Sequence, residues 1–156
     1  MARVSSQPAI LFVCLGNICR SPLAEGALRA ELTARGLGWE VDSAGTGDWH
    51  VGNPPDPRAI EEAARRGVDI ACLRARQVVP KDFTRFTHIF ALDDKNLADL
   101  RALAPADGTA HLSLLLDMVP GHEGGSVADP YFGDDSGFAR TWDEVSLAAR
   151  TLVERL

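Results

Sequence analysis

Residues Ile10 to Pro22 read ILFVCLGNICRSP, and this stretch carries most of the information on fold and chemistry. Its short β-branched and aromatic run, which ends at Cys14, predicts a buried strand. Ser21 suits a helix N-cap and Pro22 suits the first helical position, so we expect a helix to follow over 23–35. The turn between this strand and this helix directs its backbone N–H groups at one spot, and the positive end of the helix dipole lies behind that spot. This predicts an anion site.

The residue types of this loop fit a nucleophile in a phosphate cradle. The loop N–H groups and the helix dipole would stabilise the thiolate of Cys14. Arg20, six residues later, can offer two parallel hydrogen-bond donors to phosphoryl oxygens. Gly16 and Asn17 tolerate backbone torsions that other residues resist, and the Ser21 hydroxyl could reach the Cys14 sulfur. The alternative is an ordinary strand–turn–helix in which Cys14 fills space and Arg20 is a surface charge.

The rest of the chain alternates strand and helix patterns. Strands are expected at 39–42, 88–92 and 110–115, and helices at 57–66, 94–104 and 136–156, with a long loop at 43–56 and an ambiguous segment at 71–79. Such alternation predicts a parallel sheet with helices on both faces. Ligands of such sheets bind beyond the carboxyl ends of the strands, where Cys14 lies.

Composition is that of an ordinary globular protein of one domain, with 46% hydrophobic and 24% charged residues in 156. The net charge of −6 argues against a general nucleic-acid binder, and no apolar run has the length of a membrane span. Residues 1–8 lack the order of a signal segment, although export without one would leave no trace. Three cysteines and four scattered histidines lack metal-ligand spacing, so we expect no metal and no cofactor. A cysteine nucleophile requires a reducing compartment, so we expect a cytoplasmic protein.

Five stretches in order extend these observations. They are Cys14 to Ser21 (CLGNICRS), Asp42 to Gly52 (DSAGTGDWHVG), Pro55 to Ala59 (PDPRA), Ala75 to Gln77 (ARQ) and Asp129 to Asp134 (DPYFGD). Together they resemble the landmarks of low-molecular-weight protein tyrosine phosphatases. The resemblance implies an α/β three-layer open sandwich over residues 1–156, with a four-stranded parallel sheet in the order 2-1-3-4 and the phosphate loop after the first strand. It also implies hydrolysis of phosphotyrosine monoesters through a phosphocysteine intermediate.

The resemblance assigns roles to residues outside the loop. Asp129 would be the general acid and then the base, with its backbone restricted by Pro130. A plain turn aspartate is the alternative, since Asp-Pro commonly opens turns. Trp49 and Tyr131 match slot-lining positions and Phe132 could add to the rim, although each could instead pack in the core.

Several further positions complete the expected site. Substrate-binding positions in the loop are Leu15, Gly16, Asn17, Ile18, Cys19 and Ser21. In the family, a brace of Asn17, Ser21 and Ser43 holds the loop, usually with a histidine that is Leu73 here. Asp93 matches a second supporting position, and a helix N-cap is its simpler explanation.

Two loop residues bear on regulation and specificity. Cys19 could form a disulfide with Cys14, as happens in the family, and this would protect the nucleophile from irreversible oxidation. Ile18 resembles the tyrosine-specific branch, because relatives that remove phosphate from arginine carry threonine there. We expect phosphotyrosine proteins or small aryl phosphates as substrates, inorganic phosphate as product inhibitor, a monomer, and no nucleic-acid or membrane partner.

Three alternatives remain open at this point. A thiol-dependent arsenate reductase needs two further cysteines, and only Cys72 lies downstream. An arginine phosphatase is disfavoured by Ile18 and Tyr131. A non-catalytic phosphate-binding module would be expected to have lost Cys14, Arg20 or Asp129, and all three are present.

Overall fold

Four parallel strands form the centre of the computed structural model, which describes residues 7–134 and 136–156. They are β1 (Ala9–Cys14), β2 (Glu40–Gly45), β3 (His88–Ala91) and β4 (His111–Leu114), in the order β2-β1-β3-β4. Val13 pairs with Ala44 on one side and with Ala91 on the other. The predicted parallel sheet and its order are therefore confirmed.

Strand β1 is buried along its whole length, because it lies between two strands and under helices on both faces. Successive side chains of a strand point to opposite faces. Ile10 and Phe12 accordingly join one core cluster, while Leu11 and Val13 join the other. The continuous apolar run thus reflects a central parallel strand.

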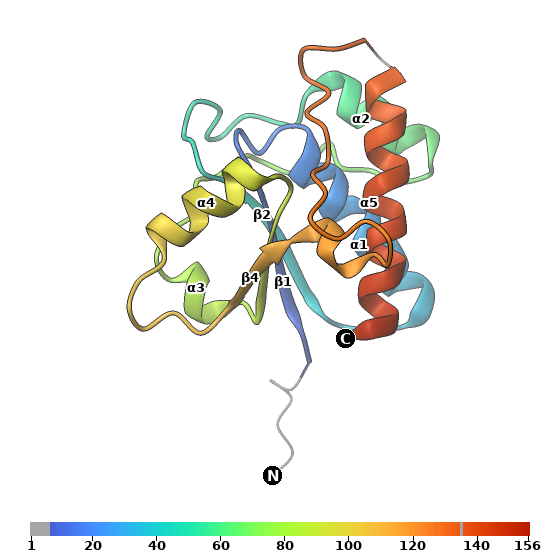
Figure 1. Cartoon of the computed structure of the whole chain (residues 1–156). Coiled ribbons are helices and arrows are strands. Elements are labelled where there is room, and N and C mark those ends of the chain that lie inside the picture. The colour runs from blue at the N-terminus through green and yellow to red at the C-terminus, as the bar shows by residue number, and fades with distance from the viewer. Residues whose placement is uncertain (1–6, 135) are drawn as a thin grey trace.

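Helices cover both faces of the sheet, as Figure 1 shows. On one side lie α1 (Arg20–Arg35), α2 (Pro57–Arg65) and α5 (Ser136–Arg155), with α5 packed along α1. On the other lie α3 (Asp82–Arg85) and α4 (Asp94–Leu103). Trp142 of α5 is buried in the first core cluster, and Trp39 packs against that cluster from just before β2.

Two predicted boundaries were wrong for reasons of tertiary contact. Helix α1 begins at Arg20 with Cys19 as its N-cap, so Ser21 is already helical and its hydroxyl is used elsewhere. Strand β2 continues to Gly45 instead of ending at Asp42, because residues 43–45 pair with β1.

The segment at 71–79 contains no regular strand or helix, and only Gln77 forms an isolated bridge, to Gly45. A short 3-10 helix, η2 (Leu115–Met118), follows β4 and was not predicted. The remaining helix ends agree with the predictions to within one residue, which is the usual uncertainty of such ends.

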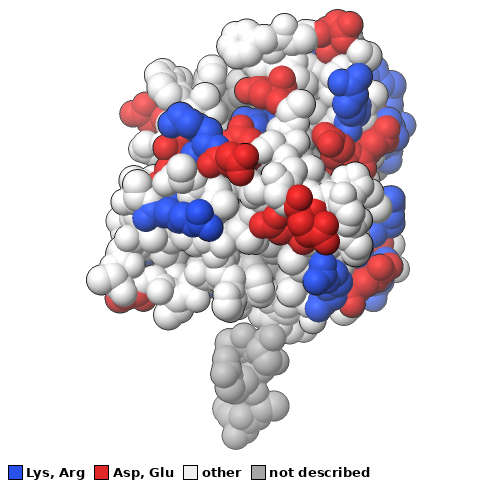
Figure 2. Space-filling view, in the orientation of Figure 1, with Lys and Arg blue, Asp and Glu red and all other residues white. Residues whose placement is uncertain are grey.

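The surface carries both signs of charge. On the face shown in Figure 2, basic groups stand beside acidic ones, as expected for a chain of net charge −6. Within the described residues, none of the helices is both long and apolar enough to cross a bilayer.

Candidate active site

The loop between β1 and α1 wraps around the sulfur of Cys14. The Asn17 backbone N–H donates to Cys14 Sγ at 3.3 Å, and the Ser21 hydroxyl oxygen lies 3.0 Å from the same sulfur. Asn17 adopts the left-handed conformation, with φ 58°, as its residue type allowed. This places a buried thiol between the Asn17 amide and the first turn of α1.

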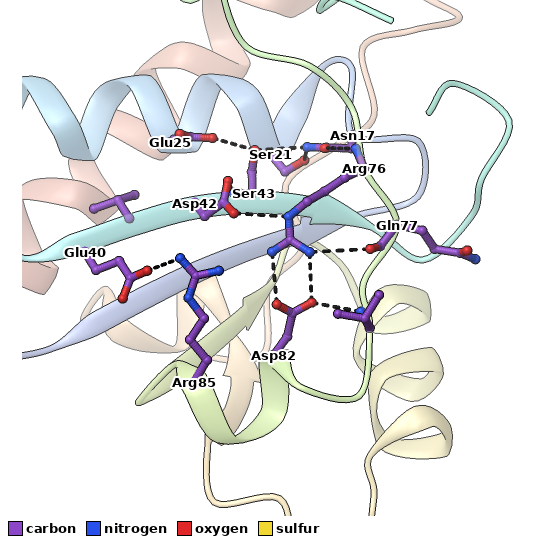
Figure 3. Close-up of polar contacts among 12 residues, drawn as sticks. Asn17, Ser21, Glu25, Glu40, Asp42, Ser43, Arg76, Gln77, Asp82 and Arg85 are labelled. Carbon is purple, nitrogen blue, oxygen red and sulfur yellow. Dashed lines mark hydrogen bonds and ion pairs between the residues drawn. The ribbon is translucent and has the colours of Figure 1, made fainter. Parts of the chain in front are cut away.

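A brace of side-chain hydrogen bonds fixes Asn17 (Figure 3). Its Nδ2 donates to Ser21 Oγ at 2.8 Å and to Ser43 Oγ at 3.0 Å. Its Oδ1 accepts from the Arg76 backbone N–H at 3.0 Å. The three predicted members of the brace are thus brought together, with Arg76 as a fourth that the sequence analysis did not identify.

The brace ends on Glu25, another residue that the sequence analysis missed. Ser43 Oγ donates to Glu25 Oε1 at 2.7 Å, and Arg29 pairs with the same carboxylate at 2.9 Å. Burial raises the pKa of Glu25, although these two partners act against that rise. Leu73 packs against the first core cluster. The hydroxyl of Ser43 therefore finds an acceptor in Glu25 although the histidine is absent.

The Arg76 guanidinium ties the far side of the brace to the sheet (Figure 3). It pairs with Asp42 of β2 at 3.1 Å and with Asp82 of α3 at 3.0 Å. Burial would lower the pKa of Arg76, but its bonds to the two carboxylates outweigh burial and raise it. Arg76 therefore stays cationic and anchors the segment that holds Asn17.

Arg20 lines the site, and hydrogen bonds to Asp93 and Val127 fix its guanidinium. Its Nη1 donates to Asp93 Oδ2 at 2.7 Å and to the Val127 carbonyl oxygen at 3.1 Å, and Nη2 lies 3.7 Å from Asp129 Oδ2. Burial would lower the pKa of Arg20, but the negative charges of Cys14 and Asp93 raise it. Arg20 is therefore a permanent cation beside the sulfur.

Asp93 makes contacts that match both of its suggested positions, the helix N-cap and the support of the loop. Its Oδ1 accepts from the Asn96 backbone N–H at 2.7 Å as the N-cap of α4, while Oδ2 accepts from Arg20. Since Asp93 lies just beyond β3, it joins the site at the carboxyl edge of the sheet.

A cavity of about 150 Å³ opens above Cys14. Its lining contains the three predicted catalytic residues and all predicted substrate-binding residues except Asn17 and Ser21, which are buried in the brace. It also contains one histidine that was not predicted. The lining residues are Cys14, Leu15, Gly16, Ile18, Cys19, Arg20, Trp49, His50, Asp129, Tyr131 and Phe132. Trp49 is 69% exposed and Phe132 90% exposed, so both form the rim and neither belongs to the core. Tyr131 stands edge-on to Phe132, with ring centroids 4.9 Å apart.

His50, one of the four scattered histidines, has a place in the site that the sequence did not indicate. It lines the cavity, and its Cδ2 lies only 3.0 Å from where a Cβ on Gly16 would be. Glycine at position 16 therefore lets the histidine ring approach the phosphate loop. The landmark around Trp49 contained this residue, but its type gave no sign of the contact.

Cys19, the N-cap residue of α1, is a buried free thiol that lines the cavity. Burial raises its pKa well above the ordinary value, and the nearby Asp56 adds to the rise. Cys14 is also free, so the disulfide between them stays a prediction.

Comparison with known proteins agrees with this geometry. Residues 9–156 match the family model described as low molecular weight phosphotyrosine protein phosphatase. The low molecular weight protein-tyrosine-phosphatase YfkJ of Bacillus subtilis is 43% identical over 150 residues, which cover 95% of this chain and 92% of that protein. The crystal structure of YfkJ superposes with a TM-score of 0.88 at 37% identity, covering 97% and 96% of the two chains.

Two other solved structures are equally similar in fold. Primo-1 gives a TM-score of 0.90 at 36% identity, covering 95% of this chain and 97% of that one. An arginine phosphatase of Drosophila gives 0.89 at 32% identity, covering 94% and 96%. The match to the family model over nearly the whole chain, together with these relatives, shows that the chain belongs to the low molecular weight phosphotyrosine protein phosphatase family.

Proposed function

We propose that Cys14, Arg20 and Asp129 carry out the two-step hydrolysis of phosphotyrosine monoesters that characterises this family. One observation supports the assignment above all: Arg20 lies within 3.7 Å of Asp129 at a cavity whose floor is the Cys14 sulfur. A nucleophile, a fixed cation and a carboxyl group thus face one cavity.

In the first step, the Cys14 thiolate attacks phosphorus while the bond from phosphorus to the phenolic oxygen breaks. The Asp129 carboxyl group gives its proton to the departing oxygen. Arg20 and the backbone N–H groups of the loop hold the three remaining oxygens as charge develops on them. This step leaves a phosphocysteine and a neutral phenol.

In the second step, water replaces the cysteine. The Asp129 carboxylate takes a proton from water as its oxygen attacks phosphorus, and the sulfur–phosphorus bond breaks with its electron pair returning to sulfur. The Ser21 hydroxyl, 3.0 Å from the sulfur, helps to stabilise the thiolate that leaves. Inorganic phosphate is released and, because it fits the same cradle, competes with substrate.

The cavity walls favour an aryl phosphate as substrate. Ile18, Trp49 and Tyr131 offer apolar surface to a phenyl ring above the loop. The similarity to an arginine phosphatase makes phosphoarginine the competing substrate. Turnover of matched phosphotyrosine and phosphoarginine peptides distinguishes the two, and we expect phosphotyrosine to be preferred.

An arsenate reductase relay receives no support from the third cysteine. Cys72 lines a different groove, with Gly26 and Arg29 of α1, and does not line the cavity above Cys14. Reduction of arsenate with thioredoxin as electron donor would contradict this assignment.

The nucleophile is tested by Cys14→Ser with p-nitrophenyl phosphate, for which we expect no turnover. Asp129→Ala should retain phosphate binding, measured by calorimetry, while turnover of phosphotyrosine falls by about 10²–10⁴-fold. Acid quenching of the wild type during the first turnover should trap phosphate on sulfur. Unimpaired hydrolysis by Cys14→Ser would refute the assignment.

We further propose that residues 1–156 form one catalytic domain that acts as a monomer in a reducing compartment such as the cytoplasm. Both core clusters pack on the same sheet, and all three cysteines are free thiols. Light scattering of the purified chain at the mass of one copy, 16.8 kDa, is the expected result.

A further inference from the structure

The guanidinium of Arg58 connects α2 to the loop that carries Asp129. Arg58 Nη2 donates to the Tyr131 carbonyl oxygen at 3.0 Å, and Nη1 donates to the Gly133 carbonyl oxygen at 3.3 Å. Both carbonyls lie within four residues of Asp129. One planar side chain therefore contacts the loop at two points, which fixes its position and its orientation.

Asp56 holds Arg58 in place and links it to the phosphate loop. Its carboxylate accepts from Arg58 Nε at 3.1 Å and from Nη2 at 3.0 Å. Its backbone N–H donates to the Ile18 carbonyl oxygen at 2.8 Å. Burial would raise the pKa of Asp56, but the hydrogen bonds from Arg58 outweigh burial and lower it. A continuous series of polar contacts thus runs from the phosphate loop through Asp56 and Arg58 to Tyr131.

Two aromatic rings complete the seat of this guanidinium. Arg58 Cζ lies 4.7 Å from the centroid of the fully buried Phe138 ring and 5.6 Å from that of Tyr131. A flat, weakly hydrated cation stacks on such rings while its edge donates hydrogen bonds. Lysine has one nitrogen and no planar group, so it would not reproduce both contacts.

The loop's own hydrogen bonds are local. The Tyr131 backbone N–H donates to Asp129 Oδ1 at 3.0 Å, and the Gly133 backbone N–H donates to the Pro130 carbonyl oxygen at 3.0 Å. These bonds shape the turn and couple the Asp129 carboxyl group to the backbone at Tyr131. They do not attach the turn to the rest of the protein. The contact of Arg20 Nη2 with Asp129 Oδ2, at 3.7 Å, and the bonds from Arg58 to the Tyr131 and Gly133 carbonyls do.

We propose that Arg58 is a positioning residue for Asp129. It holds the loop of residues 129–133 in the position from which the Asp129 carboxyl group protonates the leaving oxygen. The contact at the Tyr131 carbonyl acts on the same residue whose N–H binds the Asp129 carboxylate. This inference rests on the acid role proposed above for Asp129. It assigns to a residue outside the cavity lining the task of aiming a group inside it.

The chemistry supplies a readout that a merely structural role would not move. A phenol with a pKa near 10, such as tyrosine, needs a proton as it departs, whereas a strongly acidic phenol leaves without one. Loss of Arg58 should therefore reduce kcat/KM for phenyl phosphate by about 10–100-fold, within the cost of a displaced catalytic group. The same loss should change kcat/KM for 2,4-dinitrophenyl phosphate by less than about threefold.

The experiment compares Arg58→Ala, Arg58→Lys and the wild type, all as the full chain, on these two substrates. Because both substrates are measured on one preparation, the ratio of the two kcat/KM values is independent of the fraction of folded enzyme. Arg74→Ala is the matched control, since Arg74 also donates to two loop carbonyls, those of Ala71 at 2.8 Å and Leu73 at 2.7 Å. We expect a wild-type ratio for this control and altered ratios for both Arg58 variants.

A double-mutant cycle with Asp129→Ala tests whether Arg58 acts through the acid. In the Asp129→Ala background, Arg58→Ala should alter kcat/KM for phenyl phosphate by less than about twofold. An equal loss on both substrates, or an undiminished loss in this background, overturns the positioning role and leaves the acid role intact. If Asp129→Ala alone leaves the ratio of the two substrates unchanged, the acid role itself fails and the positioning role fails with it.

Discussion

Replacing Asn17 separates two contributions to the phosphate loop, its side-chain bonds and its left-handed backbone. The side chain is 3% exposed and makes three hydrogen bonds, to Ser21, Ser43 and the Arg76 backbone. At a net value of about 1 kcal/mol each, their loss costs about 3 kcal/mol of unfolding free energy. Both Asn17→Ala and Asn17→Gly lose this amount.

The two variants differ in backbone strain. At φ 58° the Cβ of alanine strains the folded state by about 1–2 kcal/mol, and glycine avoids this strain. Glycine also gives the unfolded chain more conformational entropy, which destabilises the glycine variant by about 0.4–1 kcal/mol. Asn17→Gly should therefore be about 1 kcal/mol more stable than Asn17→Ala. Both should lose kcat/KM, because the Asn17 N–H that faces the sulfur is no longer fixed.

Urea unfolding at pH 7, analysed by linear extrapolation with a common slope, measures the free energy of unfolding of each variant. Asn53→Ala is the control, since Asn53 is exposed and should change stability by less than about 0.5 kcal/mol. A loss below about 1 kcal/mol in Asn17→Ala would show that the brace does not stabilise the fold. Equal stability of the alanine and glycine variants would remove the strain argument.

Three other measurements probe neighbouring contacts. Because Arg58 lowers the pKa of Asp56, the stability that this pair contributes is present above the ordinary pKa of about 3.9 and is lost as pH falls through the lowered pKa. Asp56→Asn should therefore destabilise by roughly 0.5–1 kcal/mol at pH 7 and by progressively less as pH falls below about 3.9, and a pH-independent loss in urea titrations would contradict this. Iodoacetate at pH 7.5 should label exposed Cys72 and spare buried Cys19, whose pKa is raised, as judged by peptide mass spectrometry. Gly45→Ala should cost about 1–3 kcal/mol and most activity, because its Cβ would lie 2.7 Å from a carbonyl oxygen of the phosphate loop; a stable, fully active variant would refute this.

Strands and helices were predictable where the burial of an element follows one regular pattern, as in β1, which is buried throughout, and in α4, which buries one face. β1 followed from its short unbroken apolar run, and the helix at Asp94–Leu103 followed from periodicity. Ser21 misled because its neighbour Pro22 matches a helix start, yet its hydroxyl bonds to Asn17 and lies against Cys14. Residues 43–45 have the composition of a turn, but pairing with β1 overrides that preference.

Site residues were predictable from chemistry only within local stretches. Cys14 and Arg20 lie in one loop, so their types and spacing indicated the function. Glu25, 2% exposed on α1, and Arg58 read as ordinary charged helix residues. Their partners lie 18 and 73 positions away, at Ser43 and Tyr131, and no local pattern reports such contacts.

The position of β1 between β2 and β3 has a consequence for how the enzyme is made. Its reactive end meets groups that the chain delivers late, at positions 93 and 127, so the sheet must close before the guanidinium of Arg20 is seated. Contacts of such long sequence separation form slowly and cooperatively. During refolding, turnover should therefore return only with the last structural phase, and catalysis serves as a sensitive reporter of complete assembly.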